Sequence, residues 1–404
     1  MPMPLEGIRV IDWTIWQQGP VCTAMLADLG AEVIKIEERE RGDPARGMAH
    51  MYGIDPANRP NFYFEANNRN KKSLALDLGK PEGREIVHAL VGKSDVFVQN
   101  FRKGVARKLG LDYASLRGDN PMLVYATASG YGPEGPDSGE PCFDYLGLAR
   151  SGIMLAAGEP DMPPLSIAGG IADQMGAIML GYGILAALLA RERLGVGQEV
   201  EASQLGSMAV LQGLSLSMRL MLGTAVPRLY RSRAVNPLWN HYECADGKWI
   251  ALAMVEADRY WAAFSRVIGR PELSSDPRFA DIPARAANAE ACVEILDTVF
   301  KTKERDAWVK VLRESQGDFV FTPVNSVQDL PHDPQMRSNG YIADLDHPGF
   351  GKVAMVGMPV RFSATPGSLR TPAPEHGQHN EEVLLEVLGY ESARIAELRE
   401  SLVI

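Results

Sequence analysis

The residue best suited to chemistry is an aspartate at the entrance of a long apolar segment. Asp173 follows the glycine pair Gly169–Gly170 and precedes the apolar run Met175–Ala190. If a helix begins at about Gln174, its N-terminal dipole would keep the Asp173 carboxylate ionised. This segment alone favours an ordinary helix N-cap, for which aspartate is a preferred residue. A reactive carboxylate is the alternative interpretation.

A second candidate site is a nucleotide-binding turn near the N-terminus. An expected strand, helix and second strand end at Glu37, close to the spacing at which an acidic residue binds ribose. The turn between the first strand and the helix contains only Gly19, whereas the GxGxxG motif requires three glycines. The sequence therefore predicts a Rossmann-like sheet without a nicotinamide site. The P-loop, HExxH and GxSxG motifs are also absent from the sequence.

The elements that position these residues alternate between strand and helix through the first half of the chain. Short apolar runs separated by segments of helical spacing predict a parallel sheet with helices on both faces. The expected strands are Ile8–Trp13, Glu32–Glu37, Lys72–Leu78, Asp95–Phe101 and Met122–Gly132, and the expected helices include Gly19–Ala31 and a segment that begins at Pro81.

The pattern changes after about residue 220. The segment His241–Met254 is typical of a β-hairpin whose turn is Asp246-Gly247, and helical segments follow it. From residue 326 the chain is rich in proline and glycine. We therefore expect a large Rossmann-like α/β domain over residues 1–220 and a small α+β domain over residues 221–325. Residues 326–404 are expected to return to the large domain.

Composition restricts the class of protein. The 404 residues carry a net charge of -10, with 46% hydrophobic and 23% charged residues, which is typical of a soluble globular protein. The acidic balance argues against nucleic acid as a partner. The apolar run is shorter than the about 18 residues of a membrane span, and the N-terminus lacks a signal-peptide pattern. We expect a cytoplasmic protein with no membrane partner. No metal site is expected, because Cys22, Cys142, Cys244 and Cys292 form no zinc-binding pattern.

Several segments, in the right order along nearly the whole chain, resemble the class III coenzyme A transferase family. This CaiB/BaiF group includes formyl-CoA transferases, carnitine CoA-transferases and α-methylacyl-CoA racemases. The matching motifs include LEGIRVIDWT, MLADLGAEVIKIE, GDPAR, SDVFVQNFR, YATASGYGPEGP, GVGQEVEAS and HNEEVLLEVLGY. Each motif is weak alone, and the ordered set is specific.

The resemblance places the catalytic aspartate of the family at Asp173. It implies that this carboxylate attacks the thioester carbonyl of an acyl-CoA donor and forms a mixed anhydride and free CoA thiolate. The thiolate then attacks the anhydride, which gives an aspartyl thioester or the product. The resemblance implies coenzyme A, acyl-CoA and a carboxylic acid as substrates and no tightly bound cofactor. It also implies an interlocked homodimer of two ring-like chains.

The resemblance further implies a set of contacts with CoA. A glutamine that matches Gln17 frames the active site in formyl-CoA transferases, and Asn100–Arg102 follow a strand at the sheet edge where ligands bind. Lys108 lies where the family usually has an arginine for the CoA phosphates. The complete set of expected CoA-binding residues is Gln17, Gln18, Arg39, Leu76, Asp77, Leu78, Asn100, Phe101, Arg102, Lys108, Phe143 and Asp144.

Two departures from the family pattern affect the nucleotide end of the expected site. The family commonly has an arginine that packs on the adenine where this chain has Glu38, and Arg39 follows one residue later. The family motif DLK is DLGK here, so Gly79 moves the lysine to Lys80. Neither departure affects the expected nucleophile.

A racemase is the main alternative within the resemblance. Racemases need two acid/base groups beside the α-carbon, and the family supplies one of them as a histidine in a GHD segment. This chain has Phe143 at that position, before Asp144, and a phenylalanine carries no proton. Glu256 matches a second acid of racemases, although a residue at a helix start is the simpler interpretation. A CoA-binding protein without turnover is a more distant alternative, and the presence of Asp173 argues against it.

Two further groups of polar residues have types that suit binding. In the small domain, Arg231, Arg233, Asn240 and His241 are of the types that meet an acceptor carboxylate. His376 and His379 have a spacing that suits a metal but lie in a loop rich in glycine and proline with no third ligand nearby, so we expect a solvated loop. The glycine-run loop of formyl-CoA transferases is absent, which disfavours oxalate as the acceptor.

Overall fold

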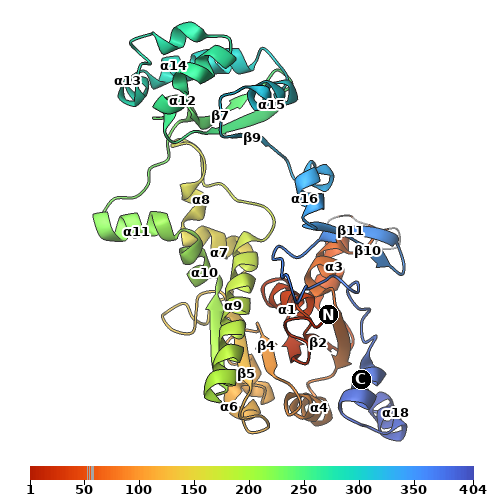
Figure 1. Ribbon diagram of the computed structural model, residues 1–404. Coiled ribbons are helices and arrows are strands. Elements are labelled where there is room, and N and C mark those ends of the chain that lie inside the picture. Colours follow the sequence, from red (N-terminus) through yellow and green to blue (C-terminus); the bar gives the residue numbers. More distant parts are fainter. Residues whose placement is uncertain (52, 54, 56–58) are drawn as a thin grey trace. The chain divides into compact units, whose positions relative to one another are not determined.

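The computed structural model of the chain describes residues 1–51, 53, 55 and 59–404 (Figure 1). The chain forms two compact units, each built from segments that are distant in sequence. The first unit comprises residues 1–154, 166–224 and 334–404, and the second comprises residues 155–165 and 225–333. Both ends of the chain therefore belong to the first unit, which also contains Asp173.

The first unit is organised around a six-stranded sheet whose neighbouring strands are all parallel. The strand order β3-β2-β1-β4-β5-β6 is that of a doubly wound nucleotide-binding fold. The predicted α/β fold with a Rossmann-like sheet is confirmed. The strands are β1 (Arg9–Trp13), β2 (Glu32–Glu38), β3 (Lys71–Leu76), β4 (Val96–Gln99), β5 (Val124–Ser129) and β6 (Gln198–Ser203).

Helices lie between the strands and continue into the C-terminal segment. As expected, Pro81 is the first residue of its helix, where its fixed φ and missing N–H cost nothing. The helices are α1 (Gln18–Asp28), α2 (Met48–Met51), α3 (Phe62–Asn68), α4 (Pro81–Val91), α5 (Val105–Leu109), α6 (Tyr113–Leu116), α7 (Asp144–Ser151), α9 (Ile171–Leu194), α10 (Gln204–Leu211), α11 (Gly213–Leu222), α16 (Pro334–Ser338), α17 (Asn380–Glu382) and α18 (Ser392–Glu400), and α8 (Ile153–Ala156) leads into the second unit.

Two apolar cores lie on opposite faces of the sheet, because successive side chains of a strand point to opposite sides. Ile11 of β1 belongs to the core that includes residues of α4 and α18. Its neighbour Val10 belongs to the core that includes residues of α1 and α9. Burial on both faces explains why the central strands are almost continuously apolar in the sequence.

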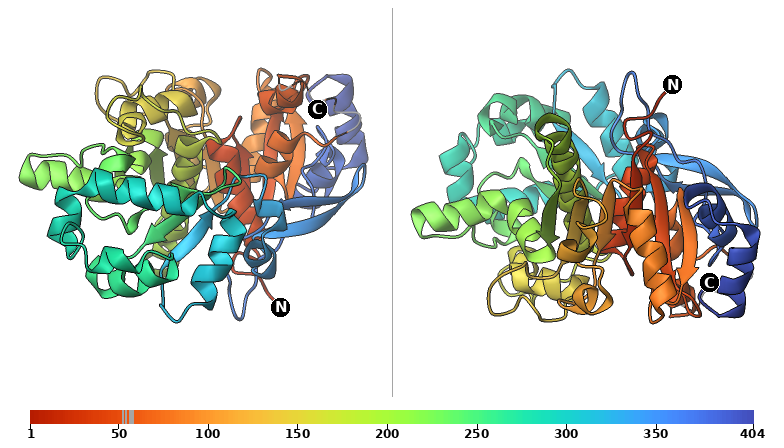
Figure 2. Two further views of the ribbon diagram at one scale, coloured as in Figure 1. Left: turned by 90° about the horizontal axis from the view of Figure 1, so that it is seen from above. Right: turned by 90° about the horizontal axis from the view of Figure 1, so that it is seen from below.

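The C-terminal segment completes the β3 side of this unit, where both views of Figure 2 show it beside the N-terminal strands. The N–H of Ala75 donates to Oδ1 of Asn380 at 2.8 Å, and the N–H of Asp77 donates to the carbonyl of Val403 at 2.9 Å. The same segment contributes an antiparallel hairpin of β10 (Ile342–His347) and β11 (Gly351–Val356), which the sequence analysis did not predict.

Helix α9 is long and apolar enough to cross a membrane by length and composition, and 44% of that stretch is buried inside the protein. Its buried side, which includes Leu180 and Ile184, forms part of the core beside α1. The helix therefore supports the sheet along its length, and Asp173 lies in its first turn.

The second unit is a three-stranded antiparallel sheet covered by helices. The predicted hairpin is confirmed: β7 (Trp239–Glu243) pairs with β8 (Trp249–Ala253), and Gly247 in the turn has a φ of 72°. A continuous apolar core joins this sheet to its helices. The remaining elements are β9 (Phe321–Val324), α12 (Ala257–Val267), α13 (Ile282–Ala287), α14 (Ala289–Phe300) and α15 (Arg305–Glu314).

Candidate active site

Asp173 is the third residue of α9 and does not cap it. The N-cap is Gly170, with a φ of 71°, and α9 begins at Ile171 rather than near Gln174. The interpretation of Asp173 as an N-cap is therefore wrong. Gly169 also has a positive φ, of 104°. The positive φ of Gly170 favours glycine there, and a Cβ at this position would displace the side-chain amide of Gln17.

The start of α9 is capped from another helix by Asp144. Oδ1 of Asp144 accepts hydrogen bonds from the N–H of Ala172 at 2.7 Å and from the N–H of Asp173 at 3.2 Å. Two of the N–H groups that a helix start leaves unsatisfied are thus bound by a residue of α7. Asp144 was predicted to contact CoA, and in the structure its contacts are with the helix that carries Asp173.

The Asp173 carboxylate is held by a buried glutamine from the start of α10. Nε2 of Gln204 donates to Oδ1 of Asp173 at 2.7 Å. The Cys142 thiol donates to Oε1 of the same glutamine at 3.2 Å, which fixes the direction of its amide. Within the described part of the chain, no donor binds Oδ2 of Asp173. One carboxylate oxygen is therefore anchored and the other is available to a substrate.

The surroundings raise the pKa of Asp173 to about 7 from its ordinary value of 3.8. Burial is the largest cause, and the charge of Asp144 adds to it, whereas the hydrogen bond from Gln204 opposes both. The helix dipole was expected to keep this carboxylate ionised. In the structure, burial and a neighbouring acid outweigh that effect.

A pocket of about 380 Å³ opens beside Asp173. It brings together six of the predicted CoA-binding residues, which follow the carboxyl ends of β1 and β4 or lie on the loop before α7. Gln204 and Trp16 also line it, and the sequence analysis identified neither of them. The six predicted residues are Gln17, Gln18, Asn100, Phe101, Arg102 and Phe143.

The polar residues among these six differ in what they contact. Both ends of the Asn100 side chain bind the backbone of Ile15, at 2.9 Å to its N–H and 2.7 Å to its carbonyl. The buried Gln18 donates to the carbonyls of Ser129 and Ala202. Asn100 and Gln18 therefore shape the walls of the pocket.

A second pocket adjoins the first through Phe101, which lines both. The predicted residues Leu76, Asp77 and Leu78 line this second pocket, whereas Arg39 and Lys108 line neither pocket. Glu38, at the position where the resemblance implies an arginine, accepts hydrogen bonds through Oε2 from the N–H groups of residues 40 and 41. This carboxylate therefore stabilises the turn after β2.

The candidate acyl-pocket residues belong to the second unit. The Arg231 guanidinium makes an ion pair with Asp297 at 2.7 Å, and Asn240 donates to the carbonyl of Arg231 at 3.1 Å. Arg233 pairs with Glu290, and the His241 ring lies 5.3 Å from that of Trp249. Glu256 is the N-cap residue of α12, as expected for a helix start.

The two histidines of the C-terminal loop contact strands that are distant in sequence, so the loop that we expected to be solvated packs against β2 and β3. Nδ1 of His379 accepts the N–H of Ser73 at 3.1 Å, and Nε2 of His376 lies 2.9 Å from the carbonyl of Glu38. Across the residues that the structure describes, no group of three potential metal ligands was found.

Comparison with known proteins identifies the family. The sequence model of CoA-transferase family III matches residues 5–380. The chain is 32% identical over 403 residues to (R)-2-hydroxy-4-methylpentanoate CoA-transferase of Clostridioides difficile, with 100% of both chains covered. It is 34% identical over 389 residues to succinate–glutarate CoA-transferase of Agrobacterium fabrum, covering 95% of this chain and 96% of that one.

Solved structures agree with this assignment. A CaiB/BaiF family protein from Brucella suis is 30% identical, with a TM-score of 0.85, and the match covers 96% of this chain and 100% of that chain. Rv3272 from Mycobacterium tuberculosis is 29% identical, with a TM-score of 0.80, over 94% of this chain and 98% of that one. The resemblance found in the sequence is confirmed, and the chain belongs to CoA-transferase family III.

Proposed function

We propose that this enzyme transfers coenzyme A from an acyl-CoA donor to a carboxylic acid through covalent intermediates on Asp173. The observation that carries the proposal is the Asp173 carboxylate beside a pocket, with Oδ1 held by Gln204 and Oδ2 without a protein donor in the described chain. The names of the relatives support the reaction class, since they are CoA-transferases for a 2-hydroxy acid, citramalate, mesaconate or glutarate.

The reaction follows from the chemistry of an attacking carboxylate. Oδ2 of Asp173 attacks the thioester carbonyl, the C–S bond breaks, and a mixed anhydride and CoA thiolate result. The thiolate attacks the aspartyl carbonyl, which releases the donor acid and leaves an aspartyl thioester. The acceptor carboxylate then attacks that thioester and expels the thiolate again. Attack of the thiolate on the acceptor acyl carbon gives the new acyl-CoA and regenerates Asp173.

The two adjoining pockets suit the shape of CoA. We place the reacting thioester in the first pocket and the nucleotide end toward the second, with Phe101 between them. The backbone N–H groups of the Gly169–Gly170 turn are the candidate donors to the developing oxyanion. Binding of CoA by residues 76–78 and 100–102 remains part of this proposal, whereas the structure offers no contact that supports Arg39 or Lys108.

The proposal is tested by trapping the intermediate. The native enzyme is incubated with succinyl-CoA, treated with hydroxylamine or borohydride, digested and examined by mass spectrometry. We expect modification of Asp173 in the native enzyme and none at that position in Asp173→Asn. Asp161→Asn, which removes an exposed carboxylate, is the matched control and should be trapped at Asp173 like the native enzyme. An unmodified Asp173 in an enzyme that exchanges CoA would refute the mechanism.

Racemisation of an acyl-CoA is the second candidate function, because a carboxyl group with a pKa of about 7, such as that of Asp173, also suits proton transfer. Phe143 occupies the position of the racemase histidine and is exposed at the pocket, so the second acid/base group is missing there. Incubation of a 2-methylacyl-CoA in deuterated water separates the two functions. Deuterium entering the α-carbon without any CoA exchange would favour the racemase.

We also propose that the enzyme is a homodimer. Every residue of α11 is at least partly exposed, and Leu214, Leu220 and Met221 of this helix are among the most exposed apolar side chains. Such a surface on a globular protein marks an interaction site. A second copy of the chain is the occupant that the family resemblance predicts.

A further inference from the structure

The turn that follows β1 contains a strained residue at the candidate active site. Trp16 has a φ of 65°, in the left-handed region that a bulky side chain rarely adopts. Its ring lines the pocket beside Asp173 and lies 6.2 Å from the ring of Phe143, in a T-shaped arrangement. Strain of this kind persists only where the surrounding structure holds it in place.

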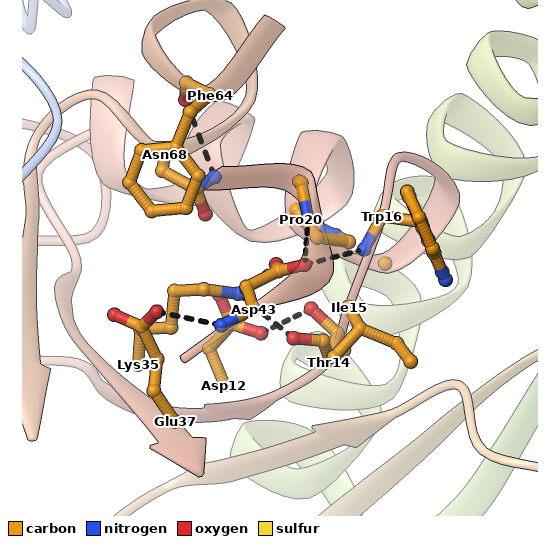
Figure 3. Close-up of polar contacts among 12 residues, drawn as sticks. Asp12, Thr14, Ile15, Trp16, Pro20, Lys35, Glu37, Asp43, Phe64 and Asn68 are labelled. Carbon is orange, nitrogen blue, oxygen red and sulfur yellow. Dashed lines mark hydrogen bonds and ion pairs between the residues drawn. The ribbon is translucent and has the colours of Figure 1, made fainter. Parts of the chain in front are cut away.

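A buried ion pair contacts this turn (Figure 3). The N–H of Trp16 donates to Oδ1 of Asp43 at 3.1 Å. Nζ of Lys35, on β2, lies 2.9 Å from the other oxygen of Asp43 and donates to the carbonyl of Thr14 at 2.8 Å. The side chains of Lys35 and Asp43 are both completely buried. The same pair thus binds the backbone on both sides of Ile15.

A second buried pair holds the far end of the turn. Nζ of Lys71, on β3, makes an ion pair with Asp12 at 2.8 Å and donates to the carbonyl of Pro20 at 2.9 Å and to Asn68 at 2.9 Å. Asp12 also accepts hydrogen bonds from the hydroxyls of Thr14 and Thr23. The side chains of Asp12 and Lys71 are completely buried too.

The two buried ion pairs have no net charge, since Lys35 and Lys71 balance Asp43 and Asp12. This neutrality lowers the free-energy cost of burying them. Burial by itself lowers the pKa of Lys35, but attraction to Asp43, Asp12 and Glu37 raises that pKa above its ordinary value. A buried ion pair adds little stability compared with well-packed apolar residues of similar volume. The network therefore needs another explanation, and the strained turn that it contacts supplies one.

We propose that Asp43 is a positioning residue for CoA transfer, which holds Trp16 in its left-handed conformation so that the pocket beside Asp173 keeps its shape. The inference rests on the proposed function of that pocket. Asp43 touches no reacting atom and acts through Trp16 and the residue after it, Gln17, whose amide lies against the Gly170 backbone. If Oδ1 of Asp43 is lost, Trp16 relaxes to a negative φ. The side chains of Trp16 and Gln17 then move from their positions at the pocket.

The test compares two double variants that differ in one acceptor atom. Lys35→Met/Asp43→Asn and Lys35→Met/Asp43→Leu both remove the two charges and the Lys35 hydrogen bond to Thr14. Only the asparagine retains an oxygen that accepts the N–H of Trp16. The assay uses succinyl-CoA as donor and glutarate as acceptor. We expect kcat of the leucine variant to be about 100-fold lower than kcat of the asparagine variant, because a displacement of pocket residues by about 1 Å has an effect of this size. The KM for succinyl-CoA should differ less than kcat.

A glycine at position 16 separates positioning from a general structural role, because glycine adopts a positive φ without strain. In the Trp16→Gly background, the difference between the two double variants should shrink to less than about threefold. A persistent difference would mean that Oδ1 acts elsewhere, for example through its hydrogen bond from Ala45. If a double variant fails to fold, the single substitutions Asp43→Asn and Asp43→Leu, each made in the native and Trp16→Gly backgrounds, supply the same comparison.

A readout that needs no turnover is the fluorescence of Trp16, obtained by subtracting the spectrum of the matching Trp16→Phe protein. We expect greater acrylamide quenching of Trp16 in the leucine variant than in the asparagine variant. Equal quenching together with equal kcat would overturn the inference. A failure of the proposed function would instead appear in the native enzyme, as the absence of a trapped Asp173.

Discussion

Replacing the proposed nucleophile with its amide should abolish activity and stabilise the protein. In Asp173→Asn, the asparagine Oδ1 accepts the hydrogen bond from Gln204 as the carboxylate does, so the packing of α9 is kept. The variant has no carboxylate to attack a thioester, and CoA exchange should fall by at least about 10³-fold. It also no longer carries a buried charge that Asp144 repels.

The size of the stabilisation follows from the pKa of Asp173, which rises from 3.8 to about 7 on folding. The folded protein therefore binds the proton more tightly than the unfolded chain, and its stability falls as the pH rises from about 4 to 7. Each pKa unit corresponds to about 1.4 kcal/mol. The full cost of ionisation is about 4 kcal/mol well above pH 7, and about 3 kcal/mol of it arises between about pH 5 and pH 8.5.

The measurement is the free energy of unfolding of the native enzyme and Asp173→Asn, from urea denaturation at about pH 5 and about pH 8.5. We expect the advantage of the variant to be larger at the higher pH by up to about 3 kcal/mol. Asp161→Asn, which removes a charge from an exposed position, should show no such pH-dependent gain. An equal difference at both pH values would refute the environment that we assign to Asp173.

Three further predictions concern the same site and the dimer. Asp144→Asn keeps the oxygen that caps α9 but removes the repelling charge, so the acid limb of kcat/KM should move to lower pH. Gln204→Ala removes a hydrogen bond that lowers the pKa of Asp173, so the same limb should move to higher pH. Leu220→Lys places a charge on exposed α11 and should shift sedimentation equilibrium toward the monomer; an unchanged mass would argue against α11 as the interface.

The central strands could be predicted from the sequence because they are buried on both faces and therefore almost continuously apolar. The strand β6 was missed since it lies at the edge of the sheet and its residues alternate between exposed and partly buried. The hairpin of β10 and β11 was missed for the same reason, because only Leu345 and Met355 of its residues are buried. The fold class depends on the central strands, so it could be predicted although β6, β10 and β11 were missed.

The site was predictable only where one residue type carries the chemistry. Asp173 was proposed as the nucleophile from its motif, whereas the contacts of Gln204 and Asp144 join residues 28 to 31 positions apart in the chain. The buried network had a local signal in the charged residues that interrupt apolar strands, Asp12 in β1 and Lys35 in β2. Its partner Asp43 lies outside that strand, and nothing in the sequence reveals that the pair meets the backbone of Trp16.

In the mechanism that we propose, the environment that destabilises the Asp173 carboxylate also favours its acylation. Formation of the mixed anhydride removes the negative charge from Asp173, and with it the cost of burial and the repulsion by Asp144. The same negative charge passes to the sulfur of CoA, which leaves the carboxylate site. An interaction that is unfavourable in the free enzyme and relieved as the bond forms lowers the barrier to that step. Burial of the nucleophile next to a second acid is therefore consistent with catalysis, provided that the working pH keeps a sufficient fraction of Asp173 ionised.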